Sequence, residues 1–305
     1  MSPANQVKVR FHPPPEDLRR FLTTFYLTEI EVADGGVITD ALQPEWANLR
    51  FFSGDNPDCW PDCWIDGGDH VERANFVVTG PSSRCTNFRL GTSRLWGVGL
   101  LPLGWAQFIR LPAADHANLV ADGQAHPSFS SFALLAASLF GAEPDEAAEL
   151  ARLIAFFRAR LANPPADAER IFVIHAALVD PQVANVAALV DRVGVGQRTI
   201  ERLCHRAFGF PPKLLLRRQR FMRSLSQFML DPTLKWIGVI DSHYHDQAQF
   251  VRDFREFMGM TPSEYAARPH PVLEKFIHER ARVAGAPVQT MDRPEGVAGM
   301  GHTQI

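Results

Sequence analysis

The sequence predicts a multidomain α+β protein with a small N-terminal β-sandwich or barrel, a helical connector and a C-terminal all-α domain. Short apolar runs occur throughout the first third of the chain, and apolar residues recur at helical spacing from about residue 128. Basic residues concentrate near the C-terminus. The 305 residues suffice for two or three cores. We expect domains at 1–114, 115–180, 181–270 and 271–305, the last being a short helix and a flexible tail.

The β-rich part extends from about Val37 to Pro112. Apolar runs such as "ANFVVTG" and "RLWGVGLLPLGWAQFIRLP" are separated by Gly, Pro, Asp and Asn, a pattern typical of short strands. Its tryptophans could line a ligand pocket, but burial in the core is the commoner role and the one we expect. They are Trp46, Trp60, Trp64, Trp96 and Trp105.

Three helical segments should follow between residues 128 and 180. They are "SSFALLAASLF", "PDEAAELARLIAFFRARLAN" and "AERIFVIHAALVD", each with apolar residues at helical spacing. Asn163, Pro164 and Pro165 separate the last two.

Charge is distributed unevenly along the chain. Residues 181–270 carry 13 Lys and Arg against 8 Asp and Glu, a net charge of +5, whereas the whole chain has −3. This asymmetry suggests a polyanionic partner for the C-terminal part, although ordinary surface variation would explain it as well.

Two pairs of short helices are expected within this basic region. In "NVAALVDRVGVGQRTIERLCHRAFG" the first helix ends at Gly194, and the second turns Ile200 and Leu203 inward and its arginines outward. The pattern returns in "LKWIGVID" and "DQAQFVRDFREFMG". Each pair is a candidate helix-turn-helix motif. One such pair would more often be a solvated bundle face, but two joined by a basic helix favour DNA binding.

The polar residues of the outward faces suit base recognition. A B-DNA major groove about 12 Å wide admits one α-helix. Arg pairs with guanine O6 and N7, and Gln pairs with adenine N6 and N7.

The stretch from about residue 183 to 268 resembles the DNA-binding domain of the AraC family of bacterial transcription regulators. The resemblance is carried by "AALVDRVGVGQRTIERLCHRAFGFPPKLLLRRQRF" and by "HYHDQAQFVRDFREFMGMTPSEY". It implies two helix-turn-helix motifs joined by a linker helix, "LLLRRQRFMRSLSQFM". The residues before them resemble, more weakly, the cupin-like sensing domains found ahead of this module.

The resemblance implies a function and a set of site residues. The function is sequence-specific binding of double-stranded DNA by a transcription regulator that is not an enzyme and needs no cofactor or metal. RNA polymerase, an unknown small-molecule effector and a homodimer through the N-terminal domain are further expected partners. The base-facing residues are Arg198, Glu201 and Arg202 in the first motif and Gln247, Gln249 and Arg252 in the second. Phosphate contacts are expected from the linker-helix arginines Arg217, Arg218, Arg220 and Arg223, although most charges of that helix should be solvated.

The sequence departs from the family pattern at two positions. Gly196 stands where a capping Ser is usual, so the first recognition helix lacks a side-chain acceptor at its start. His243 stands where the second turn usually has Gly, and a left-handed backbone there would be strained. On that ground the second motif should read DNA less tightly.

An alternative function uses the cysteines. Cys59 and Cys63, with His70 and Cys85 downstream, could hold a zinc ion or belong to a methyl-accepting DNA-repair regulator. Ordinary thiols are the competing interpretation. The N-terminus has no apolar signal core and no apolar run reaches about 20 residues, so we expect a cytoplasmic protein without a membrane span.

Overall fold

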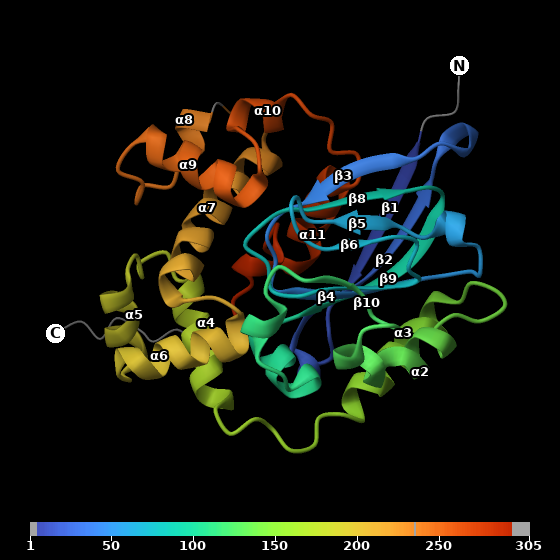
Figure 1. The fold of residues 1–305 in the computed structure, drawn as a ribbon, viewed down its shortest axis with the longest axis horizontal. Helices are drawn as coiled ribbons and strands as arrows, with labels where there is room; N and C mark the ends of the chain where they lie inside the picture. The colour runs from blue at the N-terminus through green and yellow to red at the C-terminus, as the bar shows by residue number, and fades with distance from the viewer. Residues whose placement is uncertain (1–4, 235, 295–305) are drawn as a thin grey trace.

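The computed structural model describes residues 5–234 and 236–294, and it confirms the α+β architecture. Two antiparallel β-sheets form the N-terminal part, and the helices of residues 186–266 lie to one side of them (Figure 1). Within the described residues no helix is both long and apolar enough to cross a membrane.

The larger sheet has six strands and the smaller has four. In spatial order the first comprises β1 (Gln6–His12), β2 (Leu22–Glu31), β9 (Ser93–Leu100), β4 (Ala47–Phe52), β7 (Phe76–Thr79) and β10 (Val120–Asp122). The second comprises β3 (Ile38–Leu42), β8 (Thr86–Leu90), β5 (Asp62–Trp64) and β6 (His70–Val71). Apolar side chains of both sheets share one core cluster, to which β9 contributes Leu95. The next residue, Trp96, belongs to a different core, because successive side chains of a strand point to opposite faces.

The opposite face of the large sheet is covered by the connector. The connector helices on this face are α2 (Ala133–Ser138) and α3 (Glu146–Arg158), with Leu153 and Phe157 buried against the sheet. The buried carboxylate of Glu149 accepts hydrogen bonds from the guanidinium of Arg94 and, at 2.7 Å, from the indole N–H of Trp96. The first part of the connector therefore shares a core with the β-sheets.

The remaining helices form two further cores on one long helix. They are α4 (Ala168–Val179), α5 (Val186–Val193), α6 (Gln197–Leu203), α7 (Pro212–Leu230), α8 (Trp236–Val239), α9 (Gln247–Met258), α10 (Pro262–Ala266) and α11 (Leu273–Ala284). The helices α4 to α6 pack with Leu215 and Leu216 in the first half of α7. The helices α8 to α11 pack with Phe221 and Met222 in its second half.

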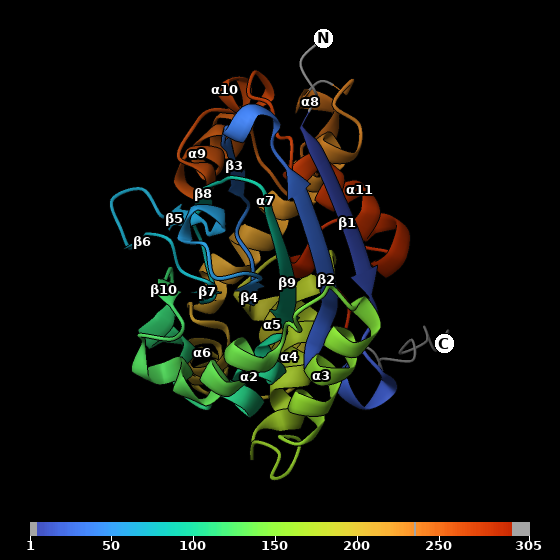
Figure 2. The same ribbon diagram turned by 90° about the vertical axis from the view of Figure 1, so that its right-hand side faces the viewer.

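The segment after α11 differs from the predicted flexible tail. The helix lies beside β1 (Figure 2), and the chain then returns to the β-sheets. The buried side chain of Gln289 accepts a hydrogen bond from the backbone N–H of Trp46 at 3.0 Å and donates one to the carbonyl of Ala47 at 3.0 Å. These contacts join residues more than 240 positions apart, so no local sequence pattern predicts them. Residues 295–305 of the expected tail lie outside the described residues.

Candidate nucleic-acid interface

The first helix pair consists of α5 and α6. The side chain of Asn185 caps α5 by accepting a hydrogen bond from the N–H of Ala188 at 3.0 Å. Gly194 ends α5 with φ of 71°, a left-handed conformation that favours glycine. Gly196 then begins α6 without a side-chain cap, as the sequence indicates. Leu189 and Ile200 are fully buried, which holds the two helices together.

The three residues predicted to face bases lie on the outer side of α6. Arg198 and Arg202 are exposed, and Glu201 is half-buried and accepts a hydrogen bond from the side chain of Gln197 at 2.8 Å. The guanidinium of Arg202 lies 3.6 Å from the carboxylate of Asp167, which precedes α4. Arg198 has no hydrogen bond or ion pair of its side chain to another described residue.

The second helix pair ends in α9. The carboxylate of Asp246 caps α9 by accepting a hydrogen bond from the N–H of Gln249 at 2.6 Å. The side-chain oxygen of Gln249 in turn accepts one from the N–H of His245 at 3.1 Å. Gln247 and Arg252 are exposed, whereas Gln249 is half-buried and already serves the start of the helix. In both pairs, then, two of the three predicted base-facing residues are exposed and the third is half-buried and hydrogen-bonded within the protein.

The backbone of His243 is not strained. Its φ is not positive, so the expected left-handed turn is absent and the strain prediction is wrong. The carboxylate of Asp241 instead accepts a hydrogen bond from the backbone N–H of His243 at 2.9 Å and lies 2.9 Å from its ring Nδ1. An aspartate side chain closes the turn that a glycine backbone would otherwise make.

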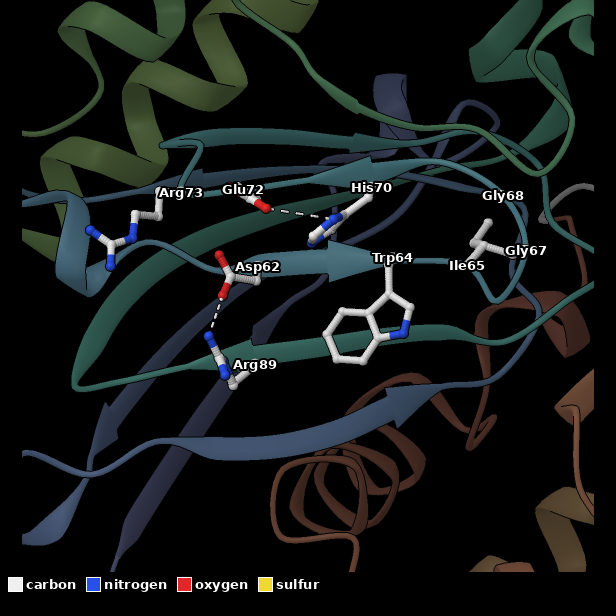
Figure 3. A pocket seen from close by; sticks show the side chains of 9 residues that line it. All are labelled: Asp62, Trp64, Ile65, Gly67, Gly68, His70, Glu72, Arg73 and Arg89. Carbon is white, nitrogen blue, oxygen red and sulfur yellow. Dashed lines mark hydrogen bonds and ion pairs between the residues drawn. The ribbon is translucent and has the colours of Figure 1, made fainter.

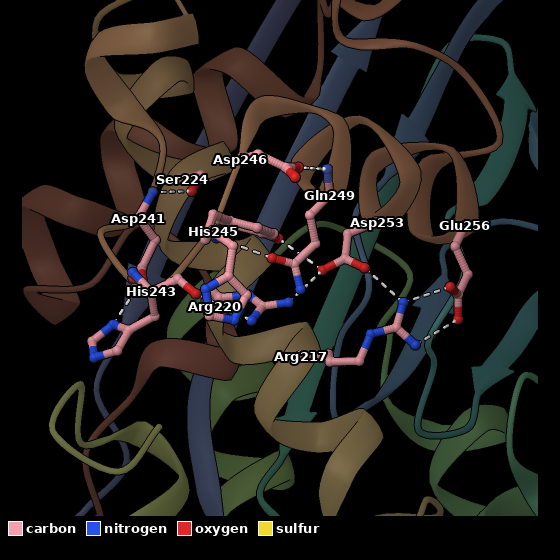
Figure 4. A network of polar contacts seen from close by, with 11 residues as sticks. Arg217, Arg220, Ser224, Asp241, His243, His245, Asp246, Gln249, Asp253 and Glu256 are labelled. Atoms are coloured by element: carbon pink, nitrogen blue, oxygen red, sulfur yellow. Dashed lines mark hydrogen bonds and ion pairs between the residues drawn. The ribbon is translucent and has the colours of Figure 1, made fainter. Parts of the chain in front are cut away.

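A network of arginines and carboxylates fixes α9 on α7 (Figure 4). The buried carboxylate of Asp253 accepts hydrogen bonds from Arg217 at 2.6 Å, from Arg220 at 2.9 Å and from the hydroxyl of Tyr244 at 3.0 Å. Arg217 also pairs with Glu256 at 2.6 Å. These arginines are therefore held by acidic groups of the protein itself.

Two more arginines of α7 also have internal partners. Arg223 pairs with Asp241 at the turn before α9. Arg218 points in the other direction and is fully buried against the β-sheets. The prediction that Arg218 contacts phosphate is wrong, because its guanidinium has no access to solvent.

Among the described residues the cysteines do not gather with other metal ligands. Burial raises the pKa of Cys63 to about 12 and that of Cys85 to about 11, so both thiols are protonated at neutral pH. The thiol of Cys85 donates to the carbonyl of Met258 at 3.3 Å. In the part of the chain that the structure describes, no three His, Cys, Asp or Glu side chains gather as metal ligands. The zinc and methyl-acceptor alternatives find no support in this arrangement.

A hollow of about 610 Å³ lies on the outer face of the four-stranded sheet (Figure 3). Trp64 lines it and is half-buried, like Trp60, whereas the other three N-terminal tryptophans are in the core as expected. Asp62 and Arg89 in the hollow form an ion pair at 2.9 Å. Its lining residues all come from the β-rich part, so it is separate from both helix pairs.

Comparison with known proteins identifies the C-terminal region. The family described as "helix-turn-helix domain" matches residues 189–268. Residues 189–268 are a helix-turn-helix domain of the AraC type. This AraC-type domain contains all six residues predicted to face bases, and its family is one of DNA-binding domains, not of enzymes.

The whole chain is similar to solved structures at low sequence identity. It is similar to ToxT from Vibrio cholerae, with 11% identity and a TM-score of 0.44 over 87% of this chain and 98% of that chain. ToxT with a bound unsaturated fatty acid gives 10% identity and a TM-score of 0.43 over 87% and 96%. No curated protein sequence matches this chain.

Proposed function

We propose that the protein is a DNA-binding transcription regulator that inserts α6 and α9 into successive major-groove segments of double-stranded DNA. The match of residues 189–268 to the helix-turn-helix domain carries this proposal. Both helices expose arginine or glutamine on the side away from their buried faces. Such a regulator would act in the cytoplasm, together with RNA polymerase.

The two recognition helices would read bases with different chemistry. Arg198 and Arg202 are exposed bidentate donors suited to guanine, and Glu201 can accept from the amino group of cytosine. On α9, Gln247 is free to pair with adenine and Arg252 with guanine. Gln249 is the sixth predicted reader, and its amide N–H₂ would be the group offered to a base, because its oxygen serves the helix cap.

The N-terminal domain would receive the regulatory signal, through a small-molecule effector or through a second copy of the chain. A cavity of about 60 Å³ lies between the two sheets, closed on one side by Val272 and Phe276 around the start of α11. Most of its lining is apolar. The buried hydroxyl of Thr28, which lines it, has no hydrogen-bond partner among the described residues. Such a site fits a small, mostly apolar effector that carries one polar group.

Footprinting of the full-length protein on fragments of its own genome tests the DNA-binding function. We expect protection of two segments on one face of the duplex, about 34 Å apart. Affinity should fall with salt, because each neutralised phosphate contributes about −0.9 to the slope of log affinity against log salt. The absence of any protected site at low salt would refute the proposal.

Base reading is tested by substitution. Arg198→Ala or Arg202→Ala should cost about 1–3 kcal/mol of binding free energy and relax the preference at particular base pairs. Arg158→Ala is the control, because Arg158 is half-exposed on α3 and pairs with Asp17, far along the chain from either motif. Equal losses for all three variants on every sequence would contradict the assignment.

A further inference from the structure

The middle of α7 separates the two helix-turn-helix units. Leu215 and Leu216 belong to the core of the first unit, and Phe221 and Met222 belong to the core of the second. Between them Arg218 is buried, as is the neighbouring Gln219. The relative placement of α6 and α9 therefore depends on how this short stretch of α7 is held.

Arg218 and Gln219 are held by backbone carbonyls, not by acidic side chains. The guanidinium of Arg218 donates to the carbonyl of Ser82 at 2.7 Å and to that of Glu45 at 3.3 Å, and it lies 4.1 Å from the ring centre of Trp46. The side chain of Gln219 donates to the carbonyl of Thr290 at 2.6 Å. Because no carboxylate neutralises Arg218 among the described residues, burial lowers its pKa to about 9. A buried cation of this kind is costly to maintain, which suggests a role other than stability.

Trp46 is a junction between Arg218 and the first unit. Its ring centre lies 5.6 Å from that of Phe208, in the π-helical turn Cys204–Phe208 that follows α6, and 5.5 Å from that of His175 on α4. Both contacts are edge-to-face. The side chain of Arg218 thus contacts the same ring that packs against the first unit.

The second unit is attached to the β-sheets separately. The backbone N–H of Cys85, just before β8, donates to the carbonyl of Phe257 near the end of α9 at 2.8 Å. Both recognition helices therefore rest on the β-rich part as well as on α7. A shift of the β-rich part against α7 would change the placement of one unit relative to the other.

We propose that Arg218 is a positioning residue that fixes the separation and rotation of the two recognition helices by joining the middle of α7 to Trp46 and to residues 45 and 82. This inference rests on the proposed DNA-binding function. Neither recognition helix contains Arg218, so its effect on DNA is indirect. Its removal leaves each unit able to enter a groove but allows the two units to change their relative placement.

The experiment compares full-length wild type with Arg218→Met on a set of duplexes. Met keeps an unbranched stem as far as the position of Nε and removes the guanidinium with its buried charge. The duplexes carry the footprinted site with zero, one or two base pairs inserted between its two protected segments. Each inserted base pair rotates the second segment by about 35°. Lys213→Met is the matched control, because Lys213 is exposed on the same helix and has no hydrogen bond or ion pair to another described residue.

Wild type and Lys213→Met should lose about tenfold in affinity for each inserted base pair. Arg218→Met should lose no more than about threefold in affinity for each, because two units that can change their relative placement tolerate altered spacing. The ratio of affinities for two duplexes does not depend on the folded fraction of the protein. Arg218→Lys keeps the charge but cannot stack a planar group on Trp46, so its affinity should fall with inserted base pairs by an amount between those of wild type and Arg218→Met. This variant replaces Arg218→Met in the experiment if the Met variant does not fold.

One result would overturn the inference, namely a spacing profile of Arg218→Met as steep as that of wild type. Such a profile means the same fractional loss of affinity on every duplex, and it would make Arg218 a purely structural residue. Failure of wild type to bind any of the duplexes would instead refute the proposed DNA-binding function.

Discussion

The two helix-turn-helix units differ in how their recognition helices are held. α6 begins at Gly196 with no side-chain cap, and its arginines are exposed. α9 begins at Asp246, which caps it, and the carboxylate of Asp253 ties it to α7 through Arg217 and Arg220. The second recognition helix is therefore fixed by more polar contacts than the first, although each helix exposes two of its three predicted base-facing residues. The two units thus differ in how their recognition helices are anchored, not in how many predicted base-facing side chains they expose.

The largest effect should come from breaking the network that fixes α9. Asp253→Ala would leave two arginines near a buried site without their shared carboxylate, and it should lower the free energy of unfolding by about 3–5 kcal/mol. Urea denaturation followed by circular dichroism measures this change. Asp191→Ala, at an exposed position of α5, is the control and should change stability by less than about 0.5 kcal/mol. Similar values for the two variants would show that α9 is not held by the network.

Acid should affect the two units over different pH ranges. Burial, with a smaller effect from nearby Arg218, lowers the pKa of His175 beside the first unit to about 3 from 6.5. The neutral ring favours folding above pH 6.5, and this stability is lost at roughly 1.4 kcal/mol per pH unit below it, because only the unfolded chain binds the proton.

At the turn of the second unit, burial alone would raise the pKa of Asp241. Hydrogen bonds from Arg223 and from His243 outweigh burial and lower that pKa below 3.8. The stability that this carboxylate supplies is present at higher pH and is lost only as the pH falls below 3.8 towards the folded-state pKa.

His175→Phe separates these two effects. The variant should lose about 2 kcal/mol less stability than wild type between pH 7 and pH 5, because the titrating ring is gone. Urea unfolding at pH 7, 6 and 5 provides the comparison. Parallel pH profiles for variant and wild type would show that His175 is not the group responsible.

The starts of the two recognition helices allow a reciprocal test. Asp246→Ala removes the cap of α9 and should cost about 1 kcal/mol of stability. Gly196→Ser adds the missing acceptor to α6 and should gain a few tenths of a kcal/mol. No atom lies within 4 Å of a Cβ placed at Gly196, so the serine meets no obstruction. Thermal unfolding of both variants measures these changes in stability. A loss of stability in Gly196→Ser would contradict the assignment of this position as the helix start.

The smallest effect should come from the contact between Asp167 and Arg202. Asp167→Asn removes a carboxylate that competes with DNA for this arginine, and affinity should rise about two- to fivefold, the range expected for an exposed ion pair. Asp180→Asn is the control, because Asp180 pairs with Arg192 on α5, outside the recognition helix. Binding titrations at one salt concentration measure both, and equal gains would point to a general loss of negative charge.

The sequence alone determined much of the DNA-binding region. Apolar residues at helical spacing predicted the buried faces of α5, α6 and α9, and Gly194 and Gly259 do end helices in left-handed conformations. These features are local, since a helix face and its ends depend on residues a few positions apart. The six predicted base-facing residues follow from the same periodicity and stay a prediction.

Other features were decided only by the tertiary structure. The sequence does not distinguish Arg217, which faces α9, from Arg218, which is buried against residues 45 and 82. The partners of Arg218 are backbone carbonyls 173 and 136 residues away, and every residue has a carbonyl, so the sequence carries no mark of this pairing. Gln289 is fixed in the same way by the backbone of residues 46 and 47. Local spacing thus fixes which face of a helix is polar, whereas the packing of distant segments decides whether a polar side chain on it faces DNA or the protein interior.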